Sequence, residues 1–166
     1  MFLYYLYSLL TAPGVIIHEL GHLLFCLFAG VKVHKVKLFQ FGNPAGYVVH
    51  NEPDSFFQSI LVSFGPLIVN SIVVLVAFAL FKPNFKDWHQ IVLLWLAIAI
   101  GLHAIPSNGD AESLFQTING RVLRNPLVII GYPLVILLYI LNFLKSIHLD
   151  FVYVVLLYWL GHIYLK

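Results

Sequence analysis

Residues 12–30 read APGVIIHELGHLLFCLFAG, an apolar stretch with a charged residue at its centre. Glu19 is the only formally charged side chain among the first 31 residues. On a helix, His18 and His22 lie one turn apart on the same face, where two imidazoles can bind one Zn²⁺. Glu19, next to them, can accept the proton from a zinc-bound water. The H-E-x-x-H pattern therefore predicts a zinc site in this segment.

The alternative interpretation is a pair of buried histidines that bond neighbouring carbonyls, with Glu19 as their partner. A charged residue at the centre of a membrane helix costs about 2.5–3.5 kcal/mol on insertion scales, so it is a functional candidate by default. Cys26 follows His22 by four residues on the same face. A thiolate ligand is conceivable there, but a free cysteine commonly packs as a small hydrophobe, and we expect packing.

The composition is that of an integral membrane protein. The chain has 166 residues, of which 61% are hydrophobic and 10% charged, and the mean hydropathy is +0.93. Soluble domains of this length are far less apolar, so the lipid bilayer is the expected environment. The net charge of +2 and the lack of a basic stripe exclude a nucleic-acid partner.

The apolar pattern predicts an all-α polytopic membrane protein with about five transmembrane helices. These helices cover about residues 2–30, 56–81, 88–105, 126–143 and 149–165. Pro13-Gly14 predicts a kink or a helix start, and Gly30 a C-cap. A short polar helix is expected over 111–125. The chain shows no repeat or linker, so we expect one domain over 1–166.

A small membrane-associated β-hairpin is predicted after the first helix. Apolar and polar residues alternate over 31–38, and further β-forming residues surround the turn Gly42-Asn43-Pro44-Ala45-Gly46. An open edge in lipid would leave backbone groups unpaired, so this hairpin must lie against protein or water.

The distribution of basic residues predicts the orientation. Five spans put the two termini on opposite sides of the membrane. One side carries Lys32, Lys35, Lys37, Arg121, Arg124 and Lys166, and the other carries Lys82, Lys86 and Lys145. The excess of basic residues is expected in the cytoplasm, which places the N-terminus outside and the C-terminus inside.

A catalytic zinc needs a third protein ligand, and Asp110 is our choice. It follows the turn Pro106-Ser107-Asn108-Gly109, which can fold back towards the bundle; the alternative is that Asp110 caps a helix. His103 is the rival ligand, or else a group that stabilises the transition state. Asn70 can donate to a substrate carbonyl or bond a neighbouring helix.

These residues resemble the site-2 protease family of intramembrane zinc metalloproteases. The matching features are H-E-L-G-H at 18–22, Gly65-Pro66 followed by Asn70, and a Pro-containing turn that ends in Asp110. The resemblance covers about residues 10–115, the three-helix core of that family, and leaves two additional helices in 126–166. It implies that His18, His22 and Asp110 bind zinc and that Glu19 is the general base.

Two motifs differ from the usual pattern of that family. Asn70 lies five residues after Gly65 rather than four, and Gly109-Asp110-Ala111 stands in place of Leu-Asp-Gly. The resemblance implies a zinc-dependent endopeptidase that hydrolyses peptide bonds in or next to transmembrane segments of protein substrates. The differences motivate the alternative, an inactive metal-binding or helix-binding protein with the same fold. A metal transporter is a weaker idea, because the last two spans contain few ionisable groups.

Overall fold

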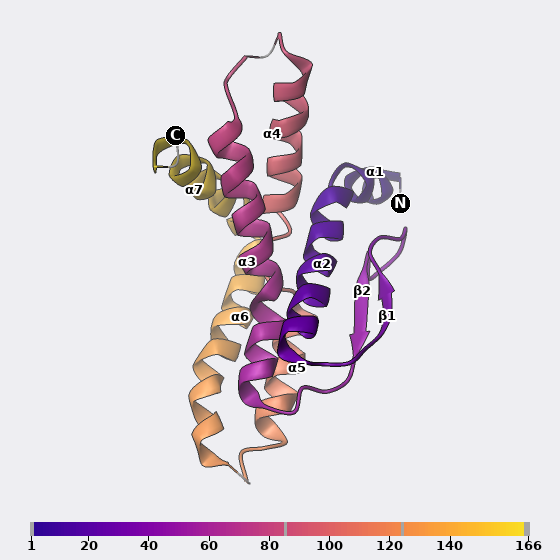
Figure 1. Ribbon diagram of the computed structural model, residues 1–166, viewed down its shortest axis with the longest axis vertical. Helices are drawn as coiled ribbons and strands as arrows, with labels where there is room; N and C mark the ends of the chain where they lie inside the picture. The colour runs from indigo at the N-terminus through magenta and orange to yellow at the C-terminus, as the bar shows by residue number, and fades with distance from the viewer. Residues whose placement is uncertain (1, 85, 124, 165–166) are drawn as a thin grey trace.

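Helices α2 (Ala12–Ala29) and α3 (Phe56–Leu80) pack along one another at the centre of the fold (Figure 1). The computed structural model describes residues 2–84, 86–123 and 125–164. The other elements are α1 (Phe2–Leu10), β1 (Val33–Lys37), β2 (Tyr47–His50), α4 (Trp88–Gly101), α5 (Asn108–Asn119), the 3₁₀ helix η1 (Pro126–Gly131), α6 (Tyr132–Lys145) and α7 (Leu149–Tyr164). Arg124, Leu165 and Lys166, which entered the predicted spans and charge distribution, lie outside the described residues.

Three segments among the described residues are long and apolar enough to cross a membrane. They are Ala12–Ala29, Phe56–Leu80 and Pro126–Lys145. Helices α4 and α7 are also apolar, but they contain only 14 and 16 residues. The prediction of a mostly helical chain with apolar helices of membrane-spanning length and a small hairpin is confirmed, whereas five spans are not confirmed.

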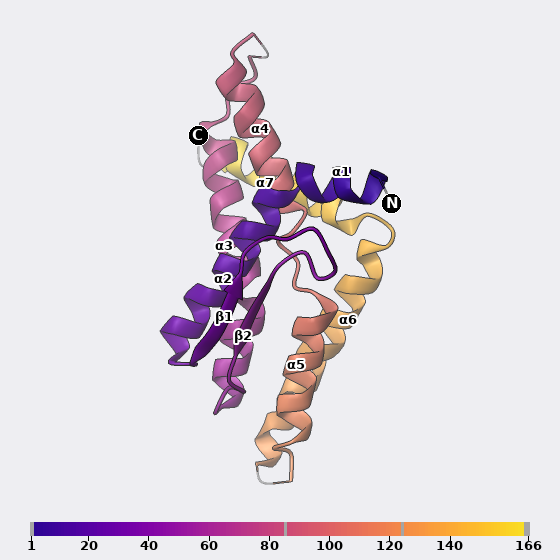
Figure 2. The same ribbon diagram turned by 90° about the vertical axis from the view of Figure 1, so that its right-hand side faces the viewer.

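The first predicted span is two helices. Helix α1 ends at Leu10 and lies across the start of α2 (Figures 1 and 2). The break between α1 and α2 falls next to Pro13, which lies in the first turn of α2. Proline has no backbone N–H, but the N–H groups of a first turn have no partner within the helix, so no hydrogen bond is lost there. Gly30 ends α2 with a φ of 71° and bonds back to the last turn, so the predicted C-cap is confirmed.

The third predicted span is shorter than expected. Helix α4 ends at Gly101, not near 105, and tight turns over 102–104 lead away from it. Pro106 disfavours helix at the residue before it, which is consistent with this early end. Helix α5 begins at Asn108 rather than 111, because Ser107 caps its N-terminus. The chain between α4 and α5 is therefore an irregular segment, residues 102–107.

The predicted hairpin is present as two antiparallel strands. Val33 pairs with His50 and Lys37 with Tyr47, and the register shifts once between Val33 and Lys35. The longer connection over 38–46 contains the predicted turn. Both strands lie alongside α2 (Figure 2), so the hairpin is placed against protein as its backbone requires.

Two apolar clusters support the fold at opposite ends of α3. Val74, Phe78, Ile100 and Leu157 belong to a cluster that joins α3, α4 and α7. The other cluster, which includes Leu114 and Leu138, joins α5 and α6 to the first half of α3. The segment 102–107 runs from the first cluster, which contains Leu102, towards α5 in the second.

Glycines allow α2 to approach both of its neighbours. A Cβ atom on Gly14 would lie 2.0 Å from the carbonyl oxygen of Ala99 on α4. A Cβ on Gly21 would lie 2.7 Å from the Cα of Pro66 on α3. These are backbone contacts that no side-chain rearrangement relieves. The distance between α2 and its neighbours therefore depends on residues without a side chain.

We predict that Gly14→Ala lowers the thermal unfolding midpoint of the detergent-solubilised protein. Overpacking in a filled interior costs about 1–3 kcal/mol, and here the added carbon meets a backbone oxygen. Gly42→Ala is the matched control, because the nearest atom to its added Cβ is 3.8 Å away. Equal midpoints for both variants would contradict this account of the α2–α4 contact.

Candidate metal centre

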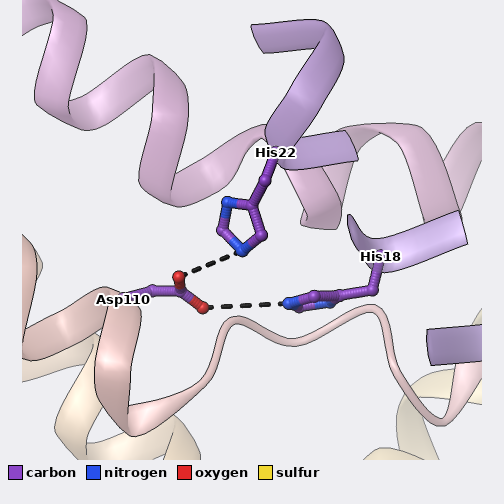
Figure 3. Close-up of side chains that lie close together, drawn as sticks. All are labelled: His18, His22 and Asp110. Atoms are coloured by element: carbon purple, nitrogen blue, oxygen red, sulfur yellow. Dashed lines mark ion pairs between the residues drawn. The ribbon is translucent and has the colours of Figure 1, made fainter. Parts of the chain in front are cut away.

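Three ionisable side chains from two distant parts of the chain meet beside α2 (Figure 3). His18 and His22 come from α2, and Asp110 comes from the first turn of α5. His22 Nε2 lies 3.1 Å from Asp110 Oδ1, and His18 Nε2 lies 3.8 Å from Asp110 Oδ2. One ligand atom of each residue lies within 4.8 Å of the other two. Among the described residues this is the group of three that can hold a metal ion.

A backbone carbonyl fixes the orientation of each imidazole. His18 Nδ1 lies 2.6 Å from the carbonyl oxygen of His103, and His22 Nδ1 lies 3.0 Å from that of Val62. A carbonyl oxygen only accepts hydrogen bonds, so each Nδ1 carries the proton and donates. Each Nε2 is then left to bind a cation, in the arrangement that metal-binding histidines usually adopt.

Asp110 both takes part in the cap of α5 and faces the two imidazoles as a candidate metal ligand. It occupies the third position of α5, and Ser107 rather than Asp110 is the N-cap. Asp110 Oδ2 accepts from the backbone N–H of Ser107 at 2.6 Å and from its hydroxyl at 2.8 Å. The backbone N–H of Asp110 donates to Ser107 Oγ at 3.2 Å. The cap thus holds the carboxylate while the same group faces the two imidazoles.

The surroundings keep Asp110 ionised. Burial by itself would raise its pKa, but the imidazoles of His22 and His18 outweigh burial and hold the pKa well below the usual range. Two imidazole nitrogens and one ionised carboxylate oxygen are a donor set that suits Zn²⁺. The convergence of both Nε2 atoms on this carboxylate therefore fits a zinc ion held by three protein ligands.

Glu19 and His103 lie in the wall of a cavity of about 530 Å³ that also contains the three converging residues. Helices α2 and α3, strand β2, the segment 102–107 and the start of α5 contribute to this wall. Glu19 is 8% exposed. The connection between the strands covers it, because a Cβ on Gly46 would lie 2.7 Å from Glu19 Cγ. The cavity thus holds a carboxylate beside the candidate metal ligands.

His103 lies at the cavity but outside the group of converging ligand atoms. Its Nε2 is buried and has no hydrogen-bond partner among the described residues. Burial, assisted by the nearby His18 and Lys145, lowers the pKa of His103 to about 4, so the ring is neutral near pH 7. Its carbonyl oxygen, as described above, orients His18. The position is compatible with a hydrogen-bond donor towards substrate, and that role stays a prediction.

Two other residues considered from the sequence lie away from this cavity. Asn70 is fully buried, and its Nδ2 donates to the carbonyl oxygen of Ile100 at 3.1 Å. This is the helix-to-helix bond that was one of its two predicted roles, and the structure does not bring Asn70 to the site. Cys26 is buried against Val31 and Val62, as expected of a packed thiol.

The sequence reasoning missed two contributions from α6. Lys145 lines the cavity, and its Nζ donates to the carbonyl oxygen of Ile105 at 3.3 Å. Asn142 Nδ2 donates to the carbonyl oxygen of Pro106 at 2.9 Å. Both bonds fix the segment 102–107. A signal was available, since Lys145 is the only charged residue in 126–145 and lies three positions after a polar residue.

One protein family matches the chain. Its model, DUF3267, carries the description "Putative zincin peptidase" and matches residues 11–119, about two thirds of the chain. No curated protein and no solved structure matches. The match supports a zinc metallopeptidase family but does not single out the site-2 proteases. Zincins are the peptidases that bind zinc through H-E-x-x-H, the pattern at 18–22 in this chain. The chain belongs to the DUF3267 family.

Proposed function

We propose that this protein is a zinc-dependent endopeptidase that hydrolyses peptide bonds in or next to membrane-spanning segments. The observation that carries the proposal is the pair of imidazoles whose Nδ1 atoms are engaged by carbonyls and whose Nε2 atoms converge on Asp110. Glu19 shares their cavity, and the apolar helices α2 and α3 form part of its wall. A buried set of ionisable groups in such helices is costly unless it has a function.

His18, His22 and Asp110 are the residues that would hold the ion. When bound, zinc acts as a Lewis acid on the scissile carbonyl and makes water acidic enough to attack it. The chain's contribution is to present three fixed donors. The carbonyl oxygens of His103 and Val62 accept hydrogen bonds from the two imidazoles, and Ser107 donates to Asp110. These bonds orient the three donor side chains before an ion binds.

We assign the proton transfer to Glu19, and the stabilisation of negative charge on the scissile carbonyl oxygen to His103. Glu19 accepts a proton from the attacking water on its carboxylate and delivers it to the nitrogen of the leaving amine. His103, neutral and with a proton on Nε2, donates to the oxygen of the former carbonyl group. That nitrogen is buried and has no partner among the described residues, so the role requires the ring to turn towards the cavity.

The substrate is expected to enter the cavity as an extended segment. A helical backbone hides its carbonyls, so a membrane-spanning substrate must unwind locally. Residues of β2, among them Tyr47, Val48 and His50, line the cavity and can pair with such a segment by β-augmentation. The orientation with the N-terminus outside is kept as part of this proposal.

We predict that the purified protein binds about one zinc per chain and that Asp110→Ala and His18→Ala lose it. Removal of an outer-shell partner alone weakens metal binding about 10–100-fold, so loss of a ligand should cost more. Metal analysis after dialysis against a competing chelator measures this. His89→Ala is the control, because His89 is exposed and pairs with Asp87. Zinc that persists in Asp110→Ala and is lost in His103→Ala would make His103 the third ligand.

We predict that Glu19→Gln keeps zinc but loses turnover by about 10²–10⁴-fold, since it removes the proton acceptor. His103→Ala should lower turnover by about 10²–10³-fold with zinc retained, as expected for loss of an oxyanion donor. Cleavage of a single-spanning reporter in proteoliposomes is the assay. Wild-type rates in Glu19→Gln would refute the mechanism, and bound zinc without cleavage of any reporter would favour a non-enzymatic protein.

A further inference from the structure

The last residue of α6 brings a positive charge into the wall of the candidate active site. Lys145 lines the same cavity as His18, Glu19 and Asp110. Figure 2 shows α6 running beside α5 towards the level at which the segment 102–107 leaves α4. Lys145 lies beyond residues 11–119, so this charge is added to the part of the chain that the family model matches.

The described residues provide no carboxylate within 4.0 Å of Lys145 Nζ. Asp110 and Asp150 act on the charge only from a greater distance. Asp110 is committed to the two imidazoles and to Ser107. Asp150 Oδ1 accepts from the N–H of Phe151 at 3.0 Å. Asp110 is therefore engaged by other groups, and Asp150 attracts Lys145 only at a distance beyond that of an ion pair.

The protein partner of Lys145 is a neutral one. Its Nζ carries three N–H donors, and the bond to the carbonyl oxygen of Ile105 uses one of them. A partly buried ammonium that bonds only a neutral acceptor is costly, and a carboxylate ligand offsets that cost. The free donors lie at a cavity that receives peptide in the proposed function.

We propose that Lys145 is a specificity-determining residue that binds a carboxylate of the peptide substrate close to the scissile bond. The carboxylate belongs to an acidic side chain or to a free C-terminus, since both present the same chemistry. The inference rests on the proposed function for the identity of the ligand as a peptide. The positive charge of Lys145 would make the cavity select apolar peptide segments that contain a carboxylate over those that do not.

A purely structural role would have different consequences. Lys145 and Asn142 both bond carbonyls of the segment 102–107, at Ile105 and Pro106, and a lysine with only that task needs a donor but no charge. Lys145→Gln keeps a donor and removes the charge. A structural role predicts that peptide preference does not depend on the charge at 145, whereas recognition of a carboxylate predicts that it does.

The test measures binding rather than turnover. Full-length protein with Glu19→Gln, in detergent, is titrated against three dye-labelled apolar peptides of equal length, and fluorescence anisotropy gives the affinities. The first peptide has an internal Gln and an amidated C-terminus. The second has Glu in place of Gln, and the third keeps Gln but has a free C-terminus. The second and third peptides distinguish the two sources of the carboxylate.

We expect at least one carboxylate peptide to bind about tenfold tighter than the neutral peptide, as a charge-assisted hydrogen bond provides. Lys145→Arg should retain the preference, Lys145→Gln should abolish it, and Lys145→Glu should make the carboxylate peptides bind more weakly than the neutral one. Lys82→Gln is the matched control, because Lys82 is exposed and lies outside the cavity.

Equal affinities for neutral and carboxylate peptides would overturn the inference, as would a preference that survives Lys145→Gln or a lack of binding by both carboxylate peptides. The comparison among peptides uses the native lysine, so equal affinities overturn the inference even if a variant at 145 fails to fold. Cleavage of the neutral peptide by protein with Glu19 tests the proposed function separately. A carboxylate preference without any cleavage would count against the function and not against this site.

Discussion

The contact between Asp110 and the two imidazoles of His18 and His22 is the constraint on which the rest of the structure depends. Three ionisable groups, two of them on the apolar helix α2, lie together and are largely buried, where an unpaired charge would be costly. A cation shared by the three side chains, or a second proton on each imidazole, draws these groups together and joins α5 to α2 across 88 residues of sequence, from His22 to Asp110. The polar centre therefore determines where the irregular segment between α4 and α5 must run.

The carbonyl groups that orient the imidazoles extend this constraint to two further elements. Val62 belongs to α3 and His103 to the segment 102–107, so the site is in order only when both lie close to α2. Gly14 and Gly21 provide that closeness because their missing side chains let the backbones approach. The packing of α2 and the geometry of the site therefore depend on each other. A methyl group added at Gly14 or Gly21 affects both.

The sequence predicted the elements whose signals are local. The H-E-x-x-H helix, its C-cap at Gly30 and the β-hairpin all follow from residue spacing and backbone preference over a few positions. The start of α5 was misplaced because Ser107 and Asp110 form a reciprocal cap, in which Asp110 is the third helical residue and not the cap itself. The count of five spans is not confirmed, because α4 and α7 are apolar but short.

Other parts of the site depend on tertiary packing that no local pattern contains. Asn70 had two plausible roles, and only the position of α4 decides in favour of the bond to Ile100. Lys145 was read as a charge at a membrane boundary, whereas the packing of α6 against α5 brings it to the cavity. A sequence pattern identifies which residues carry chemistry, and the arrangement of helices decides which of them meet.

X-ray absorption spectroscopy at the zinc edge of the purified, zinc-loaded protein tests the central claim most directly. The account predicts nitrogen and oxygen ligands at about 2.0–2.2 Å, with the multiple-scattering signature of two imidazoles and with one carboxylate. Any zinc that Asp110→Ala still binds at a saturating zinc concentration should lack the carboxylate contribution and gain no imidazole. A third imidazole in the native protein, or a sulfur ligand at about 2.3 Å from Cys26, would contradict it.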